Sequence, residues 1–131
     1  MFPKINRVRT RVFTTSDTKP VVQFYDTAEG LWGEEITLKF DRAGIAVFSL
    51  DMDLAEEKYI FLGALQKSAE HSHPDTHWNF EVNCAGNILT LNNDCKHKQN
   101  IDIKLSLIPR DDDNPLDQVV SADPVIRNEP D

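Results

Sequence analysis

The chain has 131 residues, of which 40% are hydrophobic, so it is long enough for one domain with a core and too short for two ordinary domains. Its formal net charge of -8 works against nucleic acid or an anionic membrane as the main partner. No apolar run reaches the roughly 18 residues of a membrane span, and the first residues do not resemble a signal peptide. We therefore expect a cytoplasmic protein in which Cys84 and Cys95 stay free thiols.

Hydrophobic and polar residues alternate in short segments along most of the chain, which is typical of strands that bury one face. The expected strands lie, in chain order, at residues 8–12, 20–25, 35–40, 45–50, 58–62, 78–82, 87–91 and 101–107. Residues 64–67 are not strand-like, but no long helix is supported. About eight or nine strands at short spacing predict an all-β fold, namely an antiparallel, immunoglobulin-like β-sandwich that forms a single domain over residues 1–131.

The C-terminal segment 124–131 carries two apolar residues, Val125 and Ile126, between Pro124 and Pro130. Chain ends are usually solvated and poorly ordered, and these two side chains are too apolar for such an end. A proline, which lacks the N–H donor, is tolerated at a sheet edge. The pattern therefore predicts that this segment adds a last edge strand to the sandwich.

Asp123-Pro124 is the single Asp-Pro bond of the chain. The Asp123 carboxyl group can reach its own carbonyl carbon and form a five-membered anhydride, and the tertiary proline nitrogen leaves more easily once it is protonated. A fold that holds the bond in this arrangement could cut itself there. The alternative is that the Asp-Pro pair only starts a turn or an edge strand.

The string from Asp123-Pro124 to Glu129-Pro130 resembles the signature of the DP-EP family, small bacterial proteins named for these two dipeptides. The resemblance implies a β-sandwich that cleaves itself at the Asp-Pro bond, keeps the segment 124–131 bound to 1–123, can join the new Asp123 end to a lysine, and self-assembles. It also implies an aspartate that activates a water beside the bond. The implied partners are the chain's own C-terminal segment and further copies of the chain, as in a homo-oligomer.

The motif does not identify the water-activating aspartate, and we choose Asp41, which ends the predicted strand 35–40 and can be aimed by it. The alternatives are Asp102, Asp117, Asp94 and Asp26. Tyr25, at another strand end, is a candidate hydrogen-bond donor to the carbonyl oxygen, and Ser121 is a candidate to hold the turn before the bond. Each has a simpler interpretation: Asp41 opens a turn, Tyr25 is an ordinary strand aromatic, and Ser121 is a cap.

The lysine that would join Asp123 must attack as a neutral amine, and burial favours the neutral form. Lys104 lies within the apolar run 101–108 and is the predicted nucleophile, whereas Lys96 and Lys98 lie in a polar loop. In strict alternation Lys104 falls on the face opposite Ile103, so a solvated lysine on the outer face is the alternative.

No cofactor or metal site is predicted. His71, His73 and His77 are acceptable zinc ligands, but Pro74 breaks the segment and no recognised ligand spacing appears, so a surface loop is the better interpretation. Two functions from different classes remain. The first is a single-turnover, aspartic-type endopeptidase that acts in cis on Asp123-Pro124, and the second is a non-enzymatic β-sandwich that binds or assembles with other chains.

Overall fold

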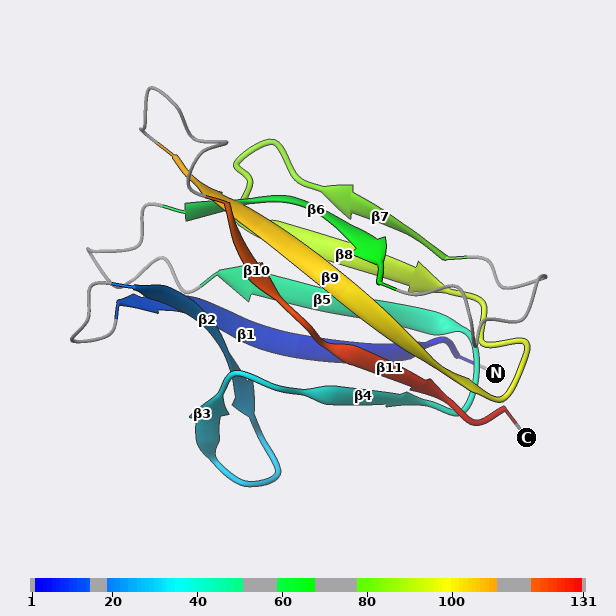
Figure 1. Ribbon diagram of the computed structural model, residues 1–131. Coiled ribbons are helices and arrows are strands. Elements are labelled where there is room, and N and C mark those ends of the chain that lie inside the picture. The colour runs from blue at the N-terminus through cyan, green and yellow to red at the C-terminus, as the bar shows by residue number, and fades with distance from the viewer. Residues whose placement is uncertain (1, 15–18, 51–58, 68–77, 111–118, 131) are drawn as a thin grey trace.

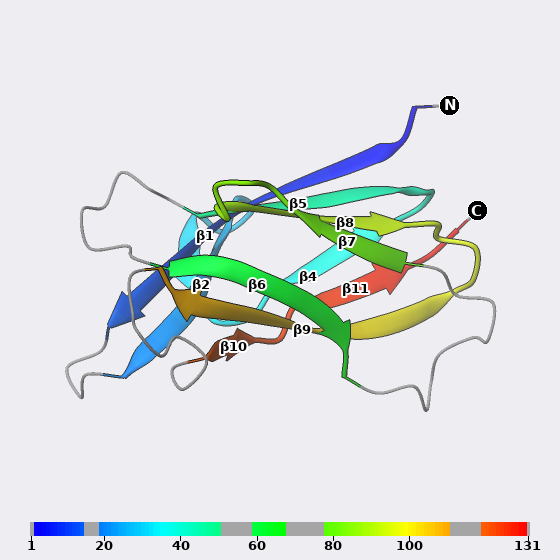
Figure 2. The same ribbon diagram turned by 90° about the horizontal axis from the view of Figure 1, so that it is seen from above.

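A computed structural model describes residues 2–14, 19–50, 59–67, 78–110 and 119–130. These residues form eleven strands and two sheets, which pack as the two layers of a sandwich (Figure 1). Figure 2 separates the layers, with β1, β5 and β8 in one and β9, β10 and β11 in the other. None of the described segments is a helix that could cross a membrane.

The first sheet has six strands in the spatial order β3-β2-β1-β5-β8-β7. Its strands are β1 (Lys4–Thr14), β2 (Pro20–Asp26), β3 (Leu31–Gly33), β5 (Gly44–Leu50), β7 (Trp78–Val82) and β8 (Ile88–Asn93). In the second sheet β9 pairs with β10 and β11, which follow each other along one edge, and with β6 along the other, and β11 also pairs with β4. Its strands are β4 (Thr37–Phe40), β6 (Tyr59–Gln66), β9 (Gln99–Pro109), β10 (Val120–Ala122) and β11 (Val125–Asn128).

The predicted all-β sandwich is confirmed, but the strand count and the strand directions differ from the prediction. The described chain has eleven strands rather than eight or nine, because β3 and β10 are three residues long and too short to give an alternating pattern. The sheets are mixed, since β1 pairs parallel with β5 and β11 pairs parallel with β4. Hydrophobic alternation indicates which face a strand buries and not the direction of its neighbour.

The core lies between the sheets and is built from alternate residues of both. Buried and exposed residues alternate strictly along the central part of β9, where Ile101, Ile103, Leu105 and Leu107 are each at most 1% exposed. Phe24 of β2 and Phe48 of β5 pack edge to face, with ring centroids 5.8 Å apart. Each such side chain contributes roughly 1.5–3 kcal/mol by leaving water. Cys84 is exposed and Cys95 is buried, and both are free thiols as predicted.

The C-terminal strand β11 is not an edge strand, which corrects the prediction. It lies between β9 and β4 and pairs with both, antiparallel to β9 and parallel to β4 (Figure 1). The prolines do not prevent this position because Pro124 and Pro130 flank the paired residues Val125–Asn128 and take no donor from the ladder. The tail is thus an internal part of its sheet.

Candidate functional site

The Asp123-Pro124 bond joins two strands that follow the same edge of β9. Ala122 pairs with Leu105 at the end of β10, and Val125 pairs with Asp102 at the start of β11. Two residues lie between these pairs in the tail, and two lie between them in β9. The register therefore continues across the Asp123-Pro124 bond without a bulge. Asp123 therefore lies opposite Lys104, and Pro124 lies opposite Ile103.

The prolyl side of the bond is held firmly. Pro124 is among the most deeply buried side chains, whereas Asp123 is exposed. The Ile103 N–H donates to the Pro124 carbonyl at 3.0 Å, and the Val125 N–H donates to the Ile36 carbonyl at 3.0 Å. The backbone just after the Asp123-Pro124 bond is therefore fixed from both neighbouring strands.

The carbonyl of Asp123 faces away from β9. Successive carbonyls of a strand point to opposite sides, and the Pro124 carbonyl is bonded to β9. On the other side, pairing with β4 begins only at Val125 and Thr37. The Asp123 carbonyl is therefore directed toward a pocket of about 500 Å³, whose lining is Pro20–Val22, Glu34–Thr37, Ser121–Asp123 and Val125.

Two acidic residues, Glu34 and Glu35, are among those that line this pocket together with Asp123. If the parallel register of Val125 with Thr37 continued back by two residues, beyond the start of β4, Glu35 would lie at the level of Asp123. A carboxylate within reach of the carbonyl can act as a general base on a water. Our sequence reasoning missed both glutamates, because they approach the bond only through the pairing of β11 with β4, which no local pattern reveals.

Lys67 is the cation in contact with Asp123. Its Nζ lies 3.5 Å from Asp123 Oδ1, and both side chains are about half exposed. The backbone N–H of Lys67 donates to the Asp102 carbonyl at 2.8 Å, which continues the pairing of β6 with β9 and aims the side chain across β9. An exposed pair of this kind adds little stability, so its importance is the placement of an amine beside Asp123.

The burial predicted for Lys104 is wrong, since its side chain is exposed on the outer face of β9. The alternative of strict alternation holds instead, because Ile103 and Leu105 take the buried face. Lys104 still lies directly opposite Asp123 in the register, so its role as a nucleophile stays a prediction. Lys96 and Lys98 precede β9 at its other end, where Gln99 pairs with Asn128, and are not brought to the bond.

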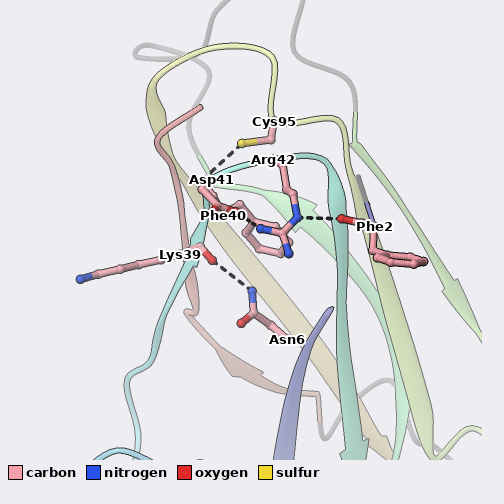
Figure 3. A network of polar contacts seen from close by, with 7 residues as sticks. All are labelled: Phe2, Asn6, Lys39, Phe40, Asp41, Arg42 and Cys95. Carbon is pink, nitrogen blue, oxygen red and sulfur yellow. Dashed lines mark hydrogen bonds and ion pairs between the residues drawn. The ribbon is translucent and has the colours of Figure 1, made fainter. Parts of the chain in front are cut away.

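Asp41 is not brought to the bond either. It lies next to the end of β4, where the Glu129 N–H donates to the Phe40 carbonyl at 2.8 Å. Glu129 follows Asp123 by six residues, and at about 3.3 Å per strand residue this puts the Asp41 end of β4 about 20 Å from Asp123. Figure 3 shows Asp41 in a different network, in which its Oδ1 is 2.7 Å from Arg42 Nη1, and Arg42 Nε donates to the Phe2 carbonyl.

Of the two other predicted residues, Ser121 lines the pocket beside Asp123 and Tyr25 does not. Tyr25 packs edge to face on Trp32, with Arg9 over its ring, and lines a separate pocket with Asp26. Ser121 lines the Asp123 pocket but lies in β10 and not in a turn.

Of the alternative aspartates, Asp26 and Asp94 take part in local turns and Asp102 lies in β9. Asp26 and Asp94 accept backbone hydrogen bonds in local turns, from Ala28 and Lys96 respectively. Asp102 lies on the outer face opposite Val125, which makes it the nearest of the alternative aspartates in the register. Asp117, His71, His73 and His77 lie outside the described residues.

These features define a class of protein: a β-sandwich with an Asp-Pro bond set between two collinear strands, an amine beside the aspartate and a carboxylate-lined pocket on the carbonyl side. Residues 6–130 match the DP-EP family model. The chain therefore belongs to the DP-EP family. No curated protein sequence matches the chain.

Proposed function

We propose that the chain is a single-turnover endopeptidase that cuts its own Asp123-Pro124 bond. The observation that carries the proposal is the contact between Lys67 Nζ and Asp123 Oδ1 at 3.5 Å, at a bond whose prolyl side is held by backbone hydrogen bonds. Lys67 holds the carboxylate at the bond and supplies protons there. The pocket on the other side leaves room for water beside Glu35.

In the first step an Asp123 carboxylate oxygen attacks the Asp123 carbonyl carbon. A C–O bond forms, the C–N bond to Pro124 breaks, and the result is a five-membered anhydride. The Lys67 ammonium group gives a proton to the departing proline nitrogen and becomes a neutral amine. This step needs no buried lysine, because the neutral amine is generated by the cut itself.

The anhydride then has two fates. Water, deprotonated by Glu35, adds to it and gives a free Asp123 carboxyl end. The neutral Lys67 amine can instead attack, expel the second carboxylate and form an amide, which leaves the large fragment one water lighter than hydrolysis does. The same attack between neighbouring molecules would build covalent oligomers, which is the route to self-association that we propose.

Positioning supplies most of the required acceleration. Well-oriented internal reactions reach effective molarities of about 10⁵–10⁸ M, and a placed acid or base adds about 10²–10⁴ in rate. One turnover per chain is sufficient, so even a modest rate completes the reaction. The segment 124–131 stays bound after the cut, since β11 retains its pairing with β9 and β4. The free thiols Cys84 and Cys95 support a place in the cytoplasm.

The test is the denatured intact mass of freshly folded protein, followed over time at neutral pH. We expect fragments that end at Asp123 and begin at Pro124, and no cut in Asp123→Ala. Asp41→Ala is the matched control, because Asp41 lies about 20 Å away, and it should cut at the wild-type rate. A full-length mass that persists for weeks would contradict the proposal and favour a non-enzymatic binding or assembly module.

A further inference from the structure

The strand β11 is seated in the sandwich as a peptide is seated in a binding groove. Both of its edges are paired, to β9 and to β4. Its inward side chains are buried: Ile126 is 3% exposed, Asn128 is 1% exposed, and Pro124 just before the strand is fully buried. A cut before Pro124 would leave this segment held only by noncovalent contacts.

The polar member of the inward set, Asn128, is recognised by one residue of the opposite sheet. Asn93 of β8 donates from Nδ2 to Asn128 Oδ1 at 2.8 Å, and Asn128 Nδ2 donates to Asn93 Oδ1 at 3.1 Å. Both side chains are buried. An amide is the side chain that can both donate and accept in this reciprocal pair.

The orientation of the Asn93 amide is fixed by the body of the protein. The backbone N–H of Cys95 donates to Asn93 Oδ1 at 3.2 Å, and a backbone N–H can only donate. The Asn93 oxygen therefore accepts from Cys95 as well as from Asn128, and Nδ2 is the atom left to donate to Asn128 Oδ1. The recognising group is thus oriented by residues outside the segment that it recognises.

The outward side chains of the tail contribute much less to recognition. Arg127 is about half exposed and pairs with Glu129 of the same segment, with Arg127 Nε 2.6 Å from Glu129 Oε1. Val125, the other outward residue of β11, is only partly buried. Selectivity for the segment therefore resides in Pro124, Ile126 and Asn128.

From these contacts we infer that residues 1–123 form a sequence-selective receptor for an extended peptide of the pattern Pro-x-aliphatic-x-Asn, with Asn93 as the residue that selects asparagine. The occupant is the segment 124–131 of a second copy of the chain, which exchanges into the groove when the bound segment leaves. The inference rests on the proposed self-cleavage, since the cut frees the segment.

The first experiment adds a fluorescent peptide with the sequence of residues 124–131 to the cut wild-type protein and follows its uptake by anisotropy. We expect the peptide to exchange with the bound segment. A peptide with Asn128→Ala should compete about tenfold to a hundredfold less well, because it leaves the buried Asn93 amide without its partner. A peptide with Arg127→Ala is the matched control and should compete within about threefold of the native sequence.

The protein is unchanged in this experiment, so misfolding cannot produce the difference. Equal competition by the native and Asn128→Ala peptides, or no uptake of either, would overturn the inference while leaving self-cleavage intact. The intact mass of the same sample reports separately whether the cut has occurred.

The second experiment does not depend on the cut. Cys95 Sγ lies 3.4 Å from the Phe40 carbonyl, which also accepts the Glu129 N–H, so the thiol lies against the tail (Figure 3). In an uncut Asp123→Ala, Cys84→Ser chain, we expect Asn128→Ala to speed alkylation of Cys95 about tenfold or more. Arg127→Ala should leave the rate nearly unchanged. Equal rates in the two variants would remove Asn128 as the residue that anchors the tail.

Discussion

Asp123 has different neighbours on its two sides, and under the proposed reaction they would lead to different products. Lys67 contacts the carboxylate on the outer face of the sheet, whereas Glu34 and Glu35 line the pocket toward which the carbonyl is directed. An amine leads to a linked product and a carboxylate that activates water leads to hydrolysis. The ratio of the two products therefore reports which side chain reaches the activated Asp123.

Replacement of Lys67 tests the amine. In Lys67→Ala the lighter, linked species should disappear, because its nitrogen forms the amide. The cut itself should slow by about 10²-fold, since the proline nitrogen loses its placed proton donor. Lys104→Ala is the control on the same face, and it should keep both products. Peptide mapping that finds the link on Lys104 would restore the nucleophile predicted from the sequence and contradict the role of Lys67.

Replacement of Glu35 tests the water. Glu35→Gln keeps the size of the side chain and removes the base, so hydrolysis should slow by about 10²-fold while attack by Lys67 continues. The measured outcome is a larger share of the linked species in the intact mass. Glu34→Gln, one residue away, should behave as wild type because the continued register would place Glu35 at the level of Asp123. The reverse result for the two variants would assign the base to Glu34.

At the scale of elements, the sequence predicts where most strands lie, but it does not predict which strands pair with each other. Alternation in β9 or β5 gives the buried face directly, and the structure confirms it. The position of β11 depends on its pairing with residues of β9 that lie 23–29 positions away in the chain and with residues of β4 that lie 88 positions away.

For the same reason the aspartate and proline of the site were predicted from a local motif, whereas Lys67 and Glu35 were missed. Lys104 was misjudged because its apolar neighbours were given more weight than the strict alternation, which places Lys104 on the face opposite Ile103.

The parallel pairing of β1 with β5 makes a prediction about Gly44. Gly44 pairs with Lys4, and a Cβ added to Gly44 would lie 2.0 Å from the Lys4 carbonyl oxygen. Because this oxygen belongs to the backbone, the strands must separate, and Gly44→Ala should lower the free energy of unfolding by about 1–3 kcal/mol. Urea unfolding in an Asp123→Ala background measures the loss without interference from the cut.

Gly63→Ala is the matched control for this effect. Its added Cβ would lie 2.9 Å from Phe80 Cζ, the end of a side chain that is 39% exposed and can turn away. The loss of stability should therefore stay below about 1 kcal/mol. Equal losses in the two variants would show that backbone approach is not what requires glycine at position 44.

At the scale of the whole molecule, the C-terminal segment connects strands of both sheets. In the strand order β11 is the neighbour of β4, and Asn128 links it to β8 in the opposite sheet. Cys95 lies at the same end of the molecule, against the Phe40 carbonyl and the Glu129 N–H. The protonation state of this thiol therefore reports on the closure of the sandwich at the C-terminal end.

Burial is the main cause that raises the pKa of the Cys95 thiol above its ordinary value of 9.0, and the nearby charges of Asp41 and Asp94 raise it further, against a lowering by the Glu129 backbone N–H. Above the ordinary value the unfolded chain releases the thiol proton while the folded chain keeps it. The unfolded state then binds fewer protons, so the free energy of unfolding must fall as pH rises through this window.

We expect this thiol to contribute a decline of at most about 1.4 kcal/mol per pH unit, and we expect that contribution to be lost in Cys95→Ala. Urea unfolding from pH 8 to 11 measures it, as the difference in slope between the Asp123→Ala chain and the same chain with Cys95→Ala. A slope in Cys95→Ala equal to that of the parent chain would mean that the thiol ionises as easily in the folded sandwich as in the unfolded chain, and that the C-terminal end does not exclude water from it.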